Sequence, residues 1–146
     1  MKIYTLAFCF ATMFGVAACG NETVSHDVST LPVKARTTIQ QNFDAAITLV
    51  KTETEGIGDK EYEVTLSDGS EVTFNGAGEW ESIERPANLA VPVGLIPTAI
   101  TNFVNEKHAG ALIIGIEKDK KGYDIDLSNG LEIQFDKTGN FVKYDK

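Results

Sequence analysis

The sequence predicts an α+β fold in which a unit of one helix and four antiparallel strands occurs twice. The two units would form one sheet of roughly eight strands with both helices on one face. The first observation is a hairpin pattern that the chain contains twice, at residues 62–74 and 123–135, each with a tyrosine at its start, a turn glycine and a closing phenylalanine. The second is that residues 31–33 return as 91–93, with proline in the middle, ahead of a helical pattern each time. One unit alone would bury too little surface, so we expect the two to pair edge to edge.

Residues 1–18 have the composition of a secretory signal peptide. Lys2 precedes an apolar run over residues 3–14, which is too short to span a membrane, and small residues follow up to Cys19. The stretch 16–19, Val-Ala-Ala-Cys, resembles a bacterial lipobox, in which the cysteine is lipid-modified and cleavage occurs just before it. An ordinary signal peptide cut nearby is the alternative. We therefore expect lipidation of Cys19 and anchoring at the outer membrane, facing the periplasm or the cell surface.

The mature chain is acidic and has no cysteine left for a disulfide. Removing residues 1–18 takes away Cys9 and one of 13 basic residues, which leaves 12 basic against 21 acidic residues, a net charge of −9. Such a surface argues against a nucleic-acid partner and against direct adhesion to anionic lipid. We expect contact with the membrane through the lipid anchor alone. A cationic partner and simple solubility both fit the charge.

The chain after the cysteine begins with a predicted tether and a helix. Residues 19–30 are polar and lack periodicity, which predicts a tether to a domain that covers residues 31–146. His26 lies in this tether, where a solvated side chain is favoured over a metal contact. Thr30 can N-cap a helix whose first turn holds Pro32 and whose apolar spacing continues to Phe43.

Four strands complete the first unit, residues 31–84. A β-branched, alternating stretch at 46–54 precedes the 62–74 hairpin, whose turn glycine supplies a positive φ. The last strand covers residues 79–84. Trp80 and Ile83 lie on opposite parities in it, so we expect a bulge or an early strand end.

The second unit, residues 91–145, repeats this order. Its helix is predicted from Pro92 or Gly94 to about Asn105, and Pro97 either marks a later first turn or kinks the helix. His108 follows in a loop, where a solvated or capping role is expected. The strand at 111–116 is more apolar than its counterpart, and we expect it near the centre of the sheet, buried on both faces. The 123–135 hairpin and a last strand at 140–144 follow.

The repeated hairpins have one apolar and one polar parity. The apolar parity, which we expect to pack against both helices, comprises Val64, Leu66, Phe74, Ile125, Leu127 and Phe135. The polar parity is the candidate binding face, and it comprises Glu63, Thr65, Glu71, Thr73, Asp124, Asp126, Glu132 and Gln134.

Three interpretations of this polar face remain open. It is a solvated surface, a protein-binding surface or, least favoured, a carboxylate pair for hydrolysis, which would require two acids in a cleft with divergent pKa values. We expect Glu63 to face Glu71, and Asp124 to face Glu132, on an open sheet with nothing to desolvate them.

No catalytic, metal or cofactor motif is present in the sequence. A nucleophilic triad needs a histidine beside a serine or cysteine, and the two histidines lie in a tether and a loop. Zinc ligands and a nucleotide-binding glycine pattern are missing. An ordinary turn is favoured over a calcium loop at residues 136–140. Trp80 is either a cap on the core or a binding hot spot. We therefore predict a protein that is not an enzyme and has no metal or cofactor.

The two-fold pattern resembles the PepSY-like proteins that share the β-lactamase-inhibitor-like fold, small exported proteins that are often lipoproteins. Leu-Pro at 31–32 and Val-Pro at 91–92 carry the resemblance, together with Tyr-Glu-Val-Thr-Leu-Ser-Asp-Gly at 62–69 and its copy at 123–130. The glycine-containing turns that follow Phe74 and Phe135 add to it.

The resemblance implies tandem αβ repeats in one continuous antiparallel sheet. In the β-lactamase inhibitor proteins the open, concave sheet face grips an enzyme, and related PepSY domains are proposed to inhibit peptidases. The disulfides of the secreted inhibitors are absent here, and no inhibitory motif transfers residue by residue. The resulting hypothesis is a lipid-anchored binding protein that acts on another envelope protein, such as a peptidase. The alternative is an envelope lipoprotein that binds cations or glycans or has a structural role.

Overall fold

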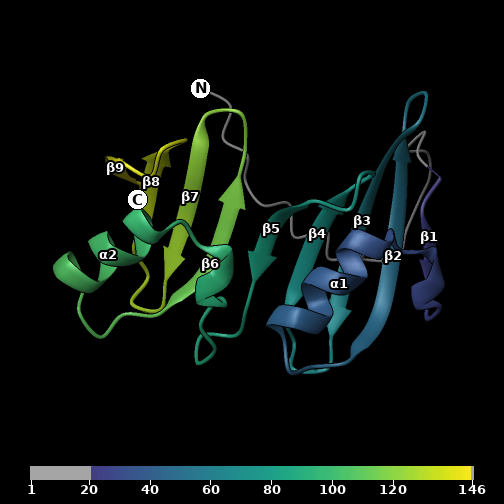
Figure 1. Cartoon of the computed structure of the whole chain (residues 1–146), viewed down its shortest axis with the longest axis horizontal. Coiled ribbons are helices and arrows are strands. Elements are labelled where there is room, and N and C mark those ends of the chain that lie inside the picture. The colour runs from purple at the N-terminus through teal and green to yellow at the C-terminus, as the bar shows by residue number, and fades with distance from the viewer. Residues whose placement is uncertain (1–20, 146) are drawn as a thin grey trace, which may run out of the picture.

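The computed structural model describes residues 21–145, so the predicted signal peptide and Cys19 lie outside the described residues. These residues form one nine-stranded antiparallel sheet and two α-helices (Figure 1), and strand neighbours follow chain order throughout. The α+β class and the single antiparallel sheet are as predicted, with one strand more than expected. The elements are β1 Thr23–Ser25, η1 (3-10) Val28–Thr30, α1 Val33–Asn42, β2 Ile47–Glu55, β3 Asp59–Leu66, β4 Glu71–Asn75, β5 Trp80–Glu84, η2 (3-10) Val93–Leu95, α2 Thr98–Lys107, β6 Ile113–Lys118, β7 Gly122–Leu127, β8 Glu132–Asp136 and β9 Phe141–Asp145.

The additional strand, β1, lies in the segment predicted to be a tether. It pairs antiparallel with β2, with Thr23 opposite Thr52 and Ser25 opposite Val50, and the short turn η1 follows it. Three residues are too few to show an alternating pattern in a sequence, which is why periodicity misses this strand. Pairing with β2 covers an otherwise open edge of the sheet.

Prolines set the start of both helices. Thr30 is not the N-cap of α1: Pro32 holds that position, and the Thr30 hydroxyl donates a hydrogen bond to the Asp27 carbonyl within η1. In the second unit Pro97 is the N-cap of α2, and Ile96 before it is extended, as a residue ahead of proline prefers. The predicted helix from Pro92 is therefore two elements, η2 and α2.

Both helices cover the same face of the sheet (Figure 1). Ala35 and Ile39 of α1, and Ile100 and Val104 of α2, are buried against it. The six residues of the predicted apolar parity are each at most 3% exposed. The alternation of the two hairpins therefore placed the core correctly.

Two further predictions about the strands can be compared with the structure. A register shift between β4 and β5 places Phe74 opposite Trp80 and Thr73 opposite Ser82, which confirms the predicted irregularity after Trp80. The strand predicted at 111–116 is β6, Ile113–Lys118, and it lies near the centre of the sheet as expected. The prediction that it is buried on both faces is wrong, because Leu112 is 38% exposed and Ile114 is only partly buried.

The chain between β5 and β6 is held by Arg85. Its guanidinium donates to Ser70 Oγ at 2.9 Å, to the Ala90 carbonyl at 2.7 Å and to Asp68 Oδ2 at 2.6 Å. Its backbone N–H donates to the Ile114 carbonyl at the start of β6. One side chain thus connects the β3–β4 turn to the link between the two halves.

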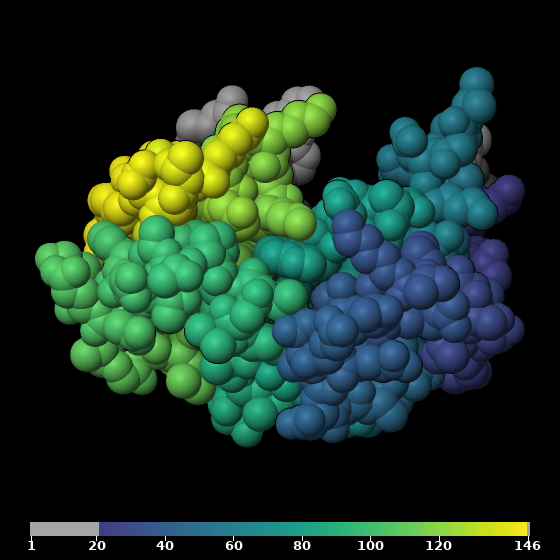
Figure 2. Space-filling model, in the orientation of Figure 1, coloured from purple at the N-terminus to yellow at the C-terminus, as the bar shows by residue number. Residues whose placement is uncertain are grey.

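The β2–β3 hairpin projects beyond the body of the molecule (Figure 2). Ile57 at its tip is fully exposed, between Gly56 and Gly58, which both have positive φ. Within residues 21–145, neither helix has the length and apolar character needed to cross a membrane.

We expect the Arg85→Met variant to lose about 2 kcal/mol of unfolding free energy, because it leaves buried Ser70 and half-buried Asp68 without their charged partner. Urea denaturation measures this loss. The matched control is Lys34→Met, which removes an ion pair of 2.7 Å to Glu79 that is more than half exposed and should change stability much less than Arg85→Met does. Equal effects of the two variants would contradict the role assigned to Arg85.

Candidate functional site

The face of the sheet opposite the helices, called the open face below, carries all eight residues predicted as a candidate binding face. They alternate with buried core residues on β3, β4, β7 and β8, so their side chains point away from α1 and α2. The structure brings the two hairpins into one sheet, in which β5 and β6 separate them.

The pairing of acids within each hairpin differs from the prediction. Glu63 lies opposite Thr73, and Glu71 lies opposite Thr65, so Glu63 and Glu71 are diagonal rather than facing neighbours. The second hairpin follows the same register, with Asp124 opposite Gln134. The turn sets this register, because the Leu66 N–H bonds to the Ser70 carbonyl and not to residue 71.

Four acids instead form a row that crosses the junction between the halves. Glu71 pairs with Glu84 across β4 and β5, Glu84 pairs with Gly115 of β6, Gly115 with Asp126 of β7, and Asp126 with Glu132 of β8. We call Glu71, Glu84, Asp126 and Glu132 the acidic row. Glu84 was not among the predicted residues, because the bulge after Trp80 obscures the parity of β5. Glu117, on the open face of β6, was missed because the predicted strand ended at residue 116, whereas β6 continues to Lys118.

Gly115 gives the acidic row its shape at the centre. A Cβ atom at this position would lie 2.6 Å from Asp126 Oδ2, so the Asp126 carboxylate lies directly over the glycine. Any larger residue would displace that carboxylate. Asp126 therefore leans from β7 over β6, toward Glu84 on the other side.

Several acids of the open face are partly desolvated, contrary to the prediction that nothing would desolvate them. Burial, followed by repulsion from Glu71, Asp126 and Glu117, raises the pKa of Glu84 to about 7. Burial is also the first cause that raises the pKa of Glu63 and of the residues Glu117, Asp124 and Asp126. Neighbouring side chains on adjacent strands remove water that an isolated surface acid would keep.

Among residues 21–145, lysine side chains occur on the open face only at its two margins. Lys51 of β2 lies 2.6 Å from Glu53 Oε1 and 3.6 Å from Glu22 Oε2, and Lys143 of β9 lies 2.8 Å from Asp145 Oδ1. Between them, the outward positions of the described strands β3 to β8 carry no lysine or arginine. The acidic row is therefore uncompensated by the part of the chain that the structure describes.

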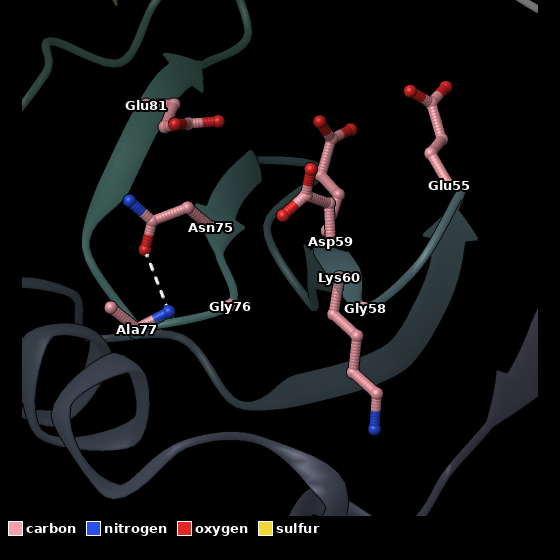
Figure 3. A pocket seen from close by; sticks show the side chains of 9 residues that line it. Glu55, Gly58, Asp59, Lys60, Asn75, Gly76, Ala77 and Glu81 are labelled. Carbon is pink, nitrogen blue, oxygen red and sulfur yellow. Dashed lines mark hydrogen bonds between the residues drawn. The ribbon is translucent and has the colours of Figure 1, made fainter.

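A shallow cavity of about 440 Å³ lies where the open face meets the β2–β3 hairpin (Figure 3). Glu55, Asp59 and Glu81 line it, and the Lys60 side chain points away from their carboxylates. Asn75 also lines the cavity, but its side-chain oxygen accepts the Ala77 N–H and so closes its own turn. Among residues 21–145, no group of three or more His, Cys, Asp or Glu side chains is placed to hold a metal ion.

The remaining candidates from the sequence have structural contacts. Trp80 is partly buried against the core, with Lys118 Nζ 4.2 Å from its ring centre, which favours the capping interpretation. The Asp136 carboxylate accepts hydrogen bonds from Thr138 and Asn140, which hold its pKa well below the usual range and close an ordinary turn. His26 Nδ1 lies 2.8 Å from the Thr48 carbonyl, and His108 Nε2 lies 3.0 Å from the Tyr144 hydroxyl. The histidines thus stand at opposite ends of the sheet.

Comparison with known proteins gives one family and several similar structures. Residues 60–143 match the family model described as "Putative beta-lactamase-inhibitor-like, PepSY-like". A "putative periplasmic protein of unknown function" from Bacteroides vulgatus is 37% identical, with 86% of this chain and 100% of that chain covered and a TM-score of 0.81. A "putative calcium-regulated periplasmic protein" from Bacteroides thetaiotaomicron is 34% identical over 86% and 97% of the two chains, with a TM-score of 0.79. A comparison with curated proteins finds no match.

We expect Glu84 to make stability fall as pH rises. Its pKa is higher in the folded state, so between about pH 4.5 and 7 the folded protein holds a proton that the unfolded chain has released, and stability declines across that range. The Glu84→Gln variant should remove this contribution and be more stable than the native protein by about 1 kcal/mol at pH 8, a value discounted for solvent screening. Thermal unfolding at pH 5 and pH 8 measures both effects.

The matched control is Glu106→Gln on α2, an exposed acid outside the open face. It should show the same difference in thermal stability between pH 5 and pH 8 as the native protein. A Glu84→Gln variant whose stability depends on pH as that of the native protein does would show that protonation of Glu84 does not contribute to folding stability.

Proposed function

The chain belongs to the beta-lactamase-inhibitor-like, PepSY-like family, and from that premise we propose that it is a non-enzymatic binding protein of the bacterial cell envelope. Its open face engages another envelope protein, and where that partner is an enzyme, such as a peptidase, binding restrains it. The descriptions of the similar Bacteroides proteins as periplasmic support the location. The fold by itself does not specify a function, so the support has to come from the face.

The acidic row is the observation that carries this proposal. The acids of the row are uncompensated, and Glu84 and Asp126 among them are partly desolvated, which lowers folding stability. Residues that lower stability are typical of functional surfaces. Glu84 and Asp126 approach each other at the junction between the halves, where Gly115 leaves room for the Asp126 carboxylate. A partner with complementary charge would relieve this repulsion. The repulsion does not improve packing of the core on the other side of the sheet, so a binding role accounts for it better than a structural one.

We propose that the domain predicted for residues 31–146 also includes β1, which pairs with β2, and that its halves, 31–84 and 91–145, are tandem repeats. The order of α1 followed by β2 to β5 matches that of α2 followed by β6 to β9. The registers also match, since Tyr62 lies opposite Phe74 as Tyr123 lies opposite Phe135.

Lipidation of Cys19 would hold this domain close to the membrane. The first strand begins at Thr23, so the predicted tether of residues 19–30 shortens to the residues before β1. Four residues span at most about 14 Å. We propose an outer-membrane anchor, facing the periplasm or the cell surface, with the sheet edge at β1 nearest to the lipid.

A second candidate function is binding of cations, for which one relative gives specific support. The similar protein from Bacteroides thetaiotaomicron is described as calcium-regulated. Here the carboxylates of Glu55, Asp59 and Glu81 line one cavity, although no preformed metal cluster occurs among the described residues. Saturable calcium binding by calorimetry, in the absence of a protein partner, would favour this candidate over the first. The same measurement with cell-wall glycan fragments covers the glycan alternative.

We expect the Cys19→Ala variant to be released from membranes, because it lacks the cysteine that carries the acyl chains. Membrane fractionation and metabolic labelling with palmitate measure this in cells that express the full precursor. Ser25→Ala, a change in β1 beyond the lipobox, is the control and should stay on the membrane. Retention and labelling of Cys19→Ala would contradict the proposed anchor.

We expect the double variant Glu71→Lys/Glu132→Lys to lose the specific partner, because two positive charges replace two acids of the acidic row. The measurement is affinity capture from envelope extract with identification by mass spectrometry, followed by an activity assay if the partner is an enzyme. Asp44→Lys/Glu106→Lys makes the same charge change at exposed positions outside the open face and should retain the partner. A partner retained equally by both variants would contradict binding through the open face.

A further inference from the structure

We infer that the open face receives an extended segment of its partner that carries lysine or arginine at alternate positions and lies across strands β4 to β8 along the acidic row. This inference rests on the proposed function and specifies the chemistry of the partner. The face is a candidate because both helices cover the opposite side of the sheet and leave this side without a covering layer.

The length of the acidic row matches an extended chain. Adjacent strands lie about 4.8 Å apart, so the four steps from Glu71 on β4 to Glu132 on β8 cover about 19 Å. An extended peptide advances about 3.3 Å per residue, and side chains on one side repeat about every 6.6 Å. Four alternate side chains of a seven-residue segment therefore cover about 20 Å, and the flexible stem of lysine takes up the small differences in spacing.

The charges around the row define where a basic segment can lie. Glu63, Glu117 and Asp124 form a second line of acids beside the row, on β3, β6 and β7. Lys51 and Lys143 stand at the margins of the sheet, and each already pairs with an acid on its own strand. A cationic segment is therefore attracted to the centre of the open face and repelled at both ends of the second line.

The centre of the row is the part of the open face that should attract a cation most strongly. Glu84 and Asp126 lie on either side of Gly115, and Asp126 leans over the glycine toward Glu84. The raised pKa of Glu84 agrees with this crowding of carboxylates. The two middle lysines or arginines of the segment would lie on either side of Gly115, one beside Glu84 and one beside Asp126. A calcium ion bound at the margin cavity of Glu55 and Asp59 would contact neither acid.

The test measures fluorescence anisotropy with two labelled heptapeptides of identical composition and blocked ends. One is Lys-Thr-Lys-Thr-Lys-Thr-Lys, and the other is Lys-Lys-Lys-Lys-Thr-Thr-Thr. At pH 8 and low salt, the mature chain should bind the alternating peptide at least about threefold more tightly. Glu84→Gln/Asp126→Asn should weaken that binding about tenfold, whereas the control Asp44→Asn/Glu106→Gln, with the same change of charge, should weaken it less than about twofold.

Equal affinity for the two peptides, or equal losses in the two double variants, would overturn the inference, because either result indicates attraction to net charge alone. Both double variants replace acids by the corresponding amides, and thermal unfolding verifies that they are folded. The proposed function fails separately: it is contradicted if capture of the envelope partner does not depend on Glu71 and Glu132. If capture depends on these acids but neither peptide binds, the open face is an interface and only the extended basic segment is wrong.

Discussion

The pairing of β5 with β6 is the constraint on which the rest of the structure depends. Only three residue pairs connect the two halves across these strands, with Ser82 opposite Glu117, Ile83 opposite Ile116 and Glu84 opposite Gly115. The middle pair continues the core from one half to the other, since both isoleucines are buried. The third pair does the same on the open face, where it joins the acids of two separate hairpins. A different pairing at this point would divide both the core and the acidic row.

The link after β5 explains how so short a pairing is stable. Arg85 follows Glu84 directly, and its side chain holds the β3–β4 turn and the link to β6 while its backbone bonds to Ile114. At the repeat offset of 61 residues, the position equivalent to Arg85 in the second half is Lys146, which lies outside the described residues. Together with the ladder between β5 and β6 and the Val91 N–H, which donates to the Ile113 carbonyl, these hydrogen bonds fix the junction. The junction in turn places Glu84 beside the acid that leans over Gly115.

The two faces of the sheet serve different physical ends. Hydrophobic burial under α1 and α2 supplies the favourable free energy of folding, and each hairpin contributes its apolar parity to it. The open face lowers the free energy of unfolding, because its partly desolvated carboxylates repel one another. Packing on the other face keeps the sheet folded despite this repulsion. The same unpaired carboxylates would attract a cationic partner. The structure thus places a group of the chain's many acidic residues on the open face.

The sequence by itself determined the class of fold, the two hairpins, their buried parity and the irregularity after Trp80, because these depend on neighbours within about ten residues. It also indicated the polar parity of each hairpin. The tertiary structure decided the rest: the facing partners of Glu63 and Glu71, the added strand β1 and the membership of Glu84 in the acidic row. The physical reason is that register depends on turn geometry and on pairing between distant strands, while periodicity reports only which way a side chain points. Gly115 shows this most clearly, since its role is set by Asp126 on the neighbouring strand and no local pattern marks it.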